Sequence, residues 1–248
     1  EVIYEEVPDG GFQMKIKRKR PGTLGICALI QNKYNIDAVP HVICQGFTRE
    51  ETEDFLIELH YLGIDNVLAV RGDYSGYRKS LMYGRTANRY ADDLIKQIND
   101  MNHGKYLEDS LLDADPMNFC IGAGAYPEKH FEAPNLHTDI KYTKKKIDSG
   151  AEYLVTQMFF DNKKYFEFKK ECLNSGINVP IIPGIKILTS KAQVSSLPKN
   201  FYIDIPEALA EEVAKETDKN VVEIGVEWAY NQVMELLEND APSIHFYI

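Results

Sequence analysis

Polar side chains follow several apolar runs of this 248-residue chain at the points where those runs end. Arg71, Gly72 and Asp73 follow the run VLAV, and Gln157 follows the run YLV with one threonine between them. A glycine lets a ligand approach the main chain, an aspartate offers a carboxylate, and a glutamine can both donate and accept hydrogen bonds. These residues are therefore candidates for binding a polar ring, although a strand-end ion pair or a loop anchor would use the same residue types.

A long polar segment, 124–135, contains two prolines, which favours an ordered loop. Ordered loops at strand ends often carry binding residues. The helix predicted after this loop carries Asp139, Tyr142 and Lys146 at three- and four-residue spacing, so these side chains share one face. On frequency alone, the lysines and His130 would be ordinary surface residues.

Short apolar runs alternate with helical periodicity, which predicts buried parallel strands joined by helices. The predicted strands are 38–44, 66–71, 118–124, 152–157, 178–184 and 243–248. The predicted helices are 21–33, a helix from the capping box of Thr48 and Glu51 to Gly63, 87–101, 135–149, 163–174 and 221–239. Residues 1–20 instead predict a hairpin around the turn PDGG.

Alternating strands and helices leave two architectures, a doubly wound open sheet and a (β/α)8 barrel. The nearest approach to a dinucleotide-binding glycine pattern begins at Gly122 and Gly124, but Pro127 replaces its third glycine. Polar residues after several strands are typical of a barrel, whose sites lie at the carboxyl ends of the strands. We therefore favour the barrel, although only six of its eight strands can be counted.

Charge and hydropathy exclude several classes of partner. The chain has 28 Lys and Arg against 38 Asp and Glu, and a net charge of −10 argues against nucleic-acid binding. No apolar run reaches the roughly 20 residues that cross a bilayer, and no signal peptide is evident, so we expect a cytoplasmic protein. The four cysteines are widely separated, which predicts neither a disulfide framework nor a zinc site.

Six segments taken together resemble the methylenetetrahydrofolate reductase family, in its bacterial form and over the catalytic barrel only. The segments are HVIC (41–44), LGIDNVLAVRGD (62–73), AYPEKHFEAPN (125–135), GAEYLVTQMFFD (150–161), VPIIPGI (179–185) and HFY (245–247). Each is weak alone, but six in the same order over residues 21 to 248 are very specific.

The resemblance implies an enzyme that reduces 5,10-methylenetetrahydrofolate to 5-methyltetrahydrofolate. NAD(P)H would supply the electrons through FAD in a ping-pong order. The positions that match the family's FAD contacts are His41, Arg71, Gly72, Asp73, Tyr90, Ala91, Tyr126, His130, Ala133, Asp139, Tyr142, Lys145 and Lys146. Lys145 and Lys146 would then face the anionic part of the cofactor.

The same resemblance places Gln157 and Gln193 where the family holds the folate or the nicotinamide. Asp73 and Gln157 are the predicted catalytic residues. Asp73 would help to bind folate and to set the electronic balance of the flavin, and Gln157 would orient the pterin amide. We expect a homo-oligomer.

The sequence departs from the family at the general acid, a glutamate on the first strand of relatives. Glu5 and Glu6 are poor substitutes, because their segment resembles an insert that follows the second strand in some bacterial relatives. Leu197 also stands where some relatives have phenylalanine. The expected domain is a single flavin-binding barrel over 1–248, with a hairpin insert at 1–20, that lacks the first strands and the last helix. A non-catalytic flavin- or folate-binding paralogue is the alternative, and an unrelated aldolase-type barrel is a weaker third.

Overall fold

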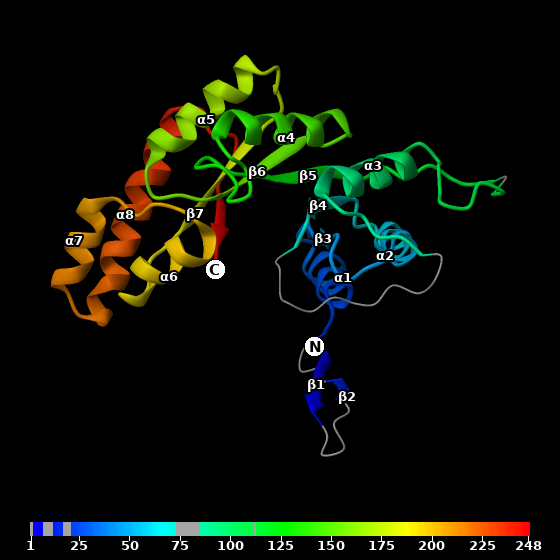
Figure 1. Ribbon diagram of the computed structural model, residues 1–248, viewed down its shortest axis with the longest axis horizontal. Coiled ribbons are helices and arrows are strands. Elements are labelled where there is room, and N and C mark those ends of the chain that lie inside the picture. The colour runs from blue at the N-terminus through cyan, green and yellow to red at the C-terminus, as the bar shows by residue number, and fades with distance from the viewer. Residues whose placement is uncertain (1, 7–11, 17–20, 73–84, 112) are drawn as a thin grey trace.

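The computed structural model describes residues 2–6, 12–16, 21–72, 85–111 and 113–248. The predicted catalytic residue Asp73 and the turn of the N-terminal hairpin lie outside these residues. The hairpin strands themselves are present, and β1 (Val2–Glu6) pairs antiparallel with β2 (Phe12–Ile16). Figure 1 shows this pair as a small separate unit that precedes the rest of the fold.

A six-stranded parallel sheet forms the centre of the fold, with its strands in sequence order (Figure 1). The strands are β3 (His41–Ile43), β4 (Asn66–Val70), β5 (Cys120–Ala125), β6 (Tyr153–Met158), β7 (Ile181–Lys186) and β8 (His245–Tyr247). All six predicted strands are therefore confirmed. Parallel neighbours in sequence order with helical crossovers are the topology of a (β/α) barrel.

Helices connect consecutive strands, and one precedes the sheet. They are α1 (Thr23–Tyr34), α2 (Arg49–Tyr61), α3 (Ala91–Asn102), α4 (Leu136–Asp148), α5 (Asn162–Asn174), α6 (Ala192–Phe201), α7 (Glu207–Lys215) and α8 (Asp218–Glu238). The sequence predicted six of these and did not predict α6 or α7. Within the described part of the chain, none of the helices combines the length and the apolarity that a bilayer crossing requires.

The sheet curls, so its two edge strands approach each other. His41 begins β3 and His245 begins β8, at opposite ends of the strand order. Burial lowers the pKa of His245, and the charge of His41 lowers it further. A charge acts in this way only at short range, so the two edge strands come near each other at these two histidines. Over the described residues, the fold is an open (β/α) barrel with two strands fewer than a closed one.

Helix α2 begins at a complete capping box. The main-chain N–H of Glu51 donates to Thr48 Oγ1 at 3.1 Å, and the main-chain N–H of Thr48 donates to Glu51 Oε2 at 2.8 Å. Two donors that the first turn of the helix leaves without intrahelical partners are thereby satisfied.

Replacing Thr48 by alanine should lower the free energy of unfolding by about 1 kcal/mol, because the cap hydroxyl is lost. Chemical denaturation of both proteins measures this difference. Thr48→Ser keeps the hydroxyl and serves as the control; an equal loss in both variants would show that the methyl group, not the cap, matters.

A second, smaller core lies beside the main one, under the C-terminal helices. Leu188, which follows β7, packs with residues of α6, α7 and α8 in this cluster. Helix α8 crosses the main chain very closely there, because a Cβ added to Gly225 would lie 2.1 Å from the carbonyl oxygen of Leu188. Only glycine permits this approach, so Gly225 fixes how α8 sits on the end of β7.

Candidate functional site

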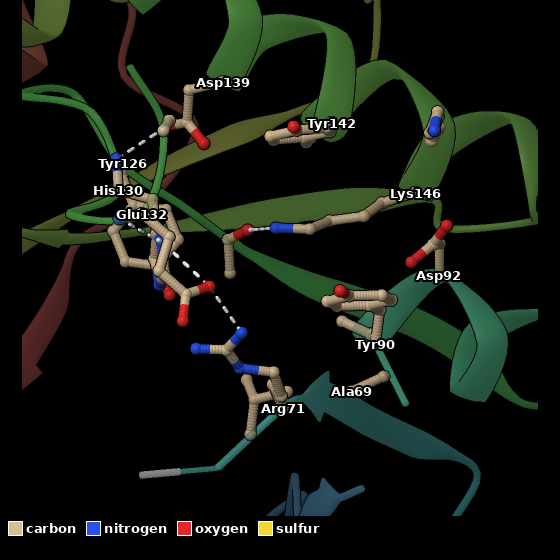
Figure 2. Close-up of a pocket in the computed structure, with 15 residues that line it drawn as sticks. Ala69, Arg71, Tyr90, Asp92, Tyr126, His130, Glu132, Asp139, Tyr142 and Lys146 are labelled. Carbon is tan, nitrogen blue, oxygen red and sulfur yellow. Dashed lines mark hydrogen bonds and ion pairs between the residues drawn. The ribbon is translucent and has the colours of Figure 1, made fainter. Parts of the chain in front are cut away.

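A cavity of about 410 Å³ opens at the carboxyl ends of β4 and β5, where a parallel barrel places its binding residues (Figure 2). Strand β4, the start of α3, the loop after β5 and helix α4 supply its walls. The lining residues are Ala69, Val70, Arg71, Tyr90, Ala91, Asp92, Gly124, Tyr126, His130, Glu132, Ala133, Asp139, Tyr142, Lys145 and Lys146. We call residues 126–135, which lead from β5 to α4, the pocket loop.

The pocket loop fixes both His130 and Arg71. Arg71 Nη1 donates to Glu132 Oε2 at 2.6 Å, and this hydrogen bond is the main reason why the pKa of Glu132 is lowered. The main-chain N–H of Glu132 donates to His130 Nδ1 at 3.2 Å. A neutral His130 with an accepting Nδ1 carries its proton on Nε2. Burial and the nearby Arg71 lower the pKa of His130, which favours that neutral form.

Lys146 and Asp139 form the charged inner wall. Lys146 reaches across the cavity and donates to the carbonyl oxygen of Gly124 at 2.7 Å (Figure 2). Asp139 is 3% exposed and accepts from the main-chain N–H of His130 at 2.9 Å. Burial lowers the pKa of Lys146 and raises that of Asp139, while the charge of each opposes the shift of the other. Each charge thus stabilises the ionised form of the other in this partly desolvated part of the cavity wall.

Three tyrosines add aromatic surface to the cavity. Tyr90 and Tyr142 are 46% and 47% exposed, so their rings are available to a ligand. Lys145 lies over the Tyr142 ring at 5.8 Å, and Lys146 lies over the Tyr126 ring at 5.6 Å. Flat rings beside cationic groups are suited to a planar ligand that carries an anion.

Cys44 is not part of the cavity lining, but it contacts two residues that are, Val70 and Tyr90. Its thiol is buried and lies within hydrogen-bonding distance of the carbonyl oxygens of Val70 and Tyr90, at 3.6 and 3.4 Å. Burial raises the pKa of this thiol to about 12, with a further contribution from Asp93. Cys44 therefore packs as a neutral residue that links β3, β4 and the start of α3.

The family model of methylenetetrahydrofolate reductase matches residues 12–248. The chain belongs to the methylenetetrahydrofolate reductase family. The family match covers every element that lines the cavity.

Curated relatives agree with this assignment. Methylenetetrahydrofolate reductase 1 of Schizosaccharomyces pombe is 30% identical over 91% of this chain, which covers 35% of that protein. The 5,10-methylenetetrahydrofolate reductase of Escherichia coli strain K12 is 29% identical over 92% of this chain and 71% of its own length. The chain thus spans about a third of the eukaryotic relatives it matches and most of the bacterial ones.

A solved structure supports the barrel. An uncharacterized protein from Clostridium thermocellum, which binds two copies of 5-methyl-5,6,7,8-tetrahydrofolic acid, superimposes with a TM-score of 0.51 at 18% identity. The overlap covers 88% of this chain and 70% of that structure. At this identity the likeness shows the fold alone, and it confirms the predicted (β/α) barrel architecture.

Most positions that the sequence assigned to FAD lie together around the cavity. The lining includes the expected residues Arg71, Tyr90, Ala91, Tyr126, His130, Ala133, Asp139, Tyr142, Lys145 and Lys146. His41 and Gly72 lie outside the lining, and Asp73 lies outside the described residues. Gly72 has a positive φ of 89° directly after Arg71, a main-chain conformation that favours glycine.

The two glutamines assigned to substrate also lie outside the cavity lining. Gln157 is on β6, where its side chain accepts the main-chain N–H of Met158 at 3.0 Å. Gln193 is on α6 and accepts the main-chain N–H of Thr189 at 2.6 Å. The folate roles of both glutamines thus remain predictions.

Sequence reasoning did not single out two charged residues of the cavity. Glu132 follows His130 by two positions in the same loop, and Asp92 follows Ala91 in the first turn of α3. The proximity of each to an assigned residue was the signal available. This proximity is weak evidence for a binding role, because exposed carboxylates are common in loops and in the first turns of helices.

Proposed function

We propose that this chain is a flavin-dependent methylenetetrahydrofolate reductase barrel whose cavity binds FAD. The family match over residues 12–248 supports the reductase assignment. The observation that carries the proposal is that positions expected to contact FAD, widely spaced along the sequence, line one cavity. FAD would carry hydride from NAD(P)H to 5,10-methylenetetrahydrofolate in a ping-pong order, yielding 5-methyltetrahydrofolate.

The cavity residues fit the two chemical parts of such a cofactor. Arg71, Lys145 and Lys146 provide positive charge for its diphosphate, and the tyrosines provide surfaces for its rings. Gly124 leaves room for a ligand, since an added Cβ would meet only Val70, at 3.9 Å. His130 would donate a hydrogen bond from Nε2, because its Nδ1 already accepts one.

Folate is the proposed substrate. The family's relatives carry names that specify methylenetetrahydrofolate, and Gln157 stands at the end of β6 where the family resemblance places a substrate contact. In this proposal Gln157 orients the pterin amide and Asp73 helps to bind folate.

A visible spectrum tests the proposal directly. Purified protein incubated with FAD and then desalted should retain a flavin absorption band. Under anaerobic conditions NADH or NADPH should bleach this band, and 5,10-methylenetetrahydrofolate should restore it. Product formation would be followed as 5-methyltetrahydrofolate.

The possible results separate the proposal from its alternative. Protein that retains no FAD would overturn the proposal as a whole. Retained flavin that is bleached but not restored by methylenetetrahydrofolate would favour a non-catalytic flavin-binding paralogue.

A further inference from the structure

The pocket loop is held on its outer side by the connection between α6 and α7. Glu128 Oε2, in this loop, accepts the main-chain N–H of Asp204 at 2.8 Å. The rings of Phe131 and Tyr202 stack at 4.9 Å with an interplanar angle of 19°. Two independent contacts therefore join segments more than seventy residues apart in the chain.

The contacts alternate with the residues that face the cavity. Tyr126, His130 and Glu132 line the cavity, whereas Glu128 and Phe131 make the outward contacts. A shift of the α6–α7 connection would thus move the outward-facing residues of the pocket loop, and with them the residues that line the cavity. Helix α6, which ends next to Tyr202, also carries Gln193, the residue expected to contact substrate.

The carboxyl group of Glu128 is in an unusual environment. Its second oxygen, Oε1, is fully buried and has no hydrogen-bond partner among the residues that the structure describes. Asp204 and two residues of the start of α5, Asp161 and Lys164, are the charged groups around it. Two acidic neighbours and one basic neighbour leave an ionised carboxylate poorly compensated at this position.

We propose that Glu128, together with the stack of Phe131 on Tyr202, forms a latch that positions the pocket loop against the α6–α7 connection and weakens when Glu128 ionises. Glu128 is a positioning residue in this scheme, because it acts on the cavity only through the loop. The role in cofactor binding rests on the proposed function, but the latch itself does not.

The direction of the pH dependence follows from the burial of Glu128. Burial raises its pKa to about 7; the hydrogen bond from Asp204 and the charge of Lys164 oppose this shift, and the charges of Asp204 and Asp161 add to it. An open latch would return the carboxyl to its ordinary pKa of 4.5. The closed latch therefore binds the proton more tightly. Its stability is fully present below pH 4.5, falls as pH rises towards 7, and is level above that.

Hydrogen exchange of the Asp204 main-chain N–H in FAD-free protein measures the latch itself. The protection factor, corrected for the intrinsic exchange rate, reports the equilibrium between closed and open states. In the unmodified protein it should fall by roughly 40-fold in total between pH 5 and pH 7, and more steeply at the lower end of this range. In Glu128→Gln it should not vary with pH, because the amide accepts the same hydrogen bond but does not ionise.

Glu53→Gln is the matched control. Glu53 Oε2 also accepts a main-chain N–H, from Leu107 at 2.9 Å, and burial also raises the pKa of Glu53. This variant should keep the pH dependence at Asp204. A flat profile in the unmodified protein, or the same pH dependence in Glu128→Gln, would overturn the latch; the first of these results suffices even if the variant fails to fold.

Addition of FAD tests whether the latch acts on the cavity. FAD should increase the protection of the Asp204 N–H, and Tyr202→Ala should weaken FAD binding about fivefold by loosening the loop. Flavin fluorescence gives this affinity, and the melting temperature checks that the variant is folded. The latch does not position the pocket if FAD binds without increasing the protection of the Asp204 N–H and Tyr202→Ala binds FAD as tightly as the unmodified protein. If FAD does not bind at all, the proposed function fails while the exchange profile still decides the latch.

Discussion

Lys146→Gln is expected to weaken FAD binding about 10- to 100-fold, the largest loss we predict for any single change in the cavity. Glutamine can still donate a hydrogen bond to the carbonyl oxygen of Gly124, so the substitution removes mainly the charge. A charged hydrogen bond is worth roughly 1.5–3 kcal/mol, which corresponds to this range. The dissociation constant would be measured by quenching of flavin fluorescence.

Two consequences make this experiment discriminating. The carboxyl of Asp139 loses the charge that offsets its burial, so its pKa should rise further in the variant. Lys144→Gln is the control, because Lys144 is on the same helix but pairs with Asp148 away from the cavity. Equal losses in both variants would show a general charge effect, and no loss in Lys146→Gln would remove this lysine from the binding site.

Gly225→Ala is expected to cause the largest loss of stability. The added Cβ would lie 2.1 Å from the carbonyl oxygen and 2.8 Å from the nitrogen of Leu188, both main-chain atoms. Main chain cannot swing aside as a flexible side chain can, so α8 must move off the end of β7. We expect a loss of about 3 kcal/mol in the free energy of unfolding, or roughly 6–12 °C in melting temperature.

Gly25→Ala provides the opposite expectation within a helix. Gly25 is exposed in α1, and its added Cβ would meet only the Pro21 Cβ, at 4.0 Å. Alanine favours a helix over glycine by up to about 1 kcal/mol, so this variant should gain stability. Calorimetry of both variants compares the two effects. A small loss in Gly225→Ala would mean that the second core tolerates displacement of α8.

The strands were predictable because each is a short apolar run with a polar boundary. Their exact starts were less so: β3 begins at His41 and β7 at Ile181, each directly after a proline that the predicted strands had included. Proline has no N–H to donate to a neighbouring strand, which favours a strand start directly after it, although Pro183 is accommodated inside β7. Helix α6 was not predicted because Pro198 interrupts its pattern, and α7 has only nine residues, too few for a clear period.

The site was predictable where its residues follow strand ends or share a helix face. Arg71 follows β4, and Lys146 shares a helix face with Tyr142. The residue pattern alone favoured surface roles for His130 and Lys146, so only the family resemblance assigned all three to one site; the structure brings them to one cavity. The latch was not predictable, because Glu128 has an ordinary position in a polar loop until Asp204 and α5 pack against it. Such environments arise from tertiary contacts between distant segments, which local patterns do not contain.

The burial of Cys44 gives the protein a built-in reporter. A thiol with a pKa of about 12 has almost no thiolate at pH 8, and only the thiolate reacts readily with alkylating reagents. Cys44 can therefore be modified only when β3, β4 and the start of α3 separate and expose it. The rate at which a maleimide or iodoacetamide labels Cys44 would thus measure how often these segments separate. A ligand that binds against Tyr90 should slow that labelling.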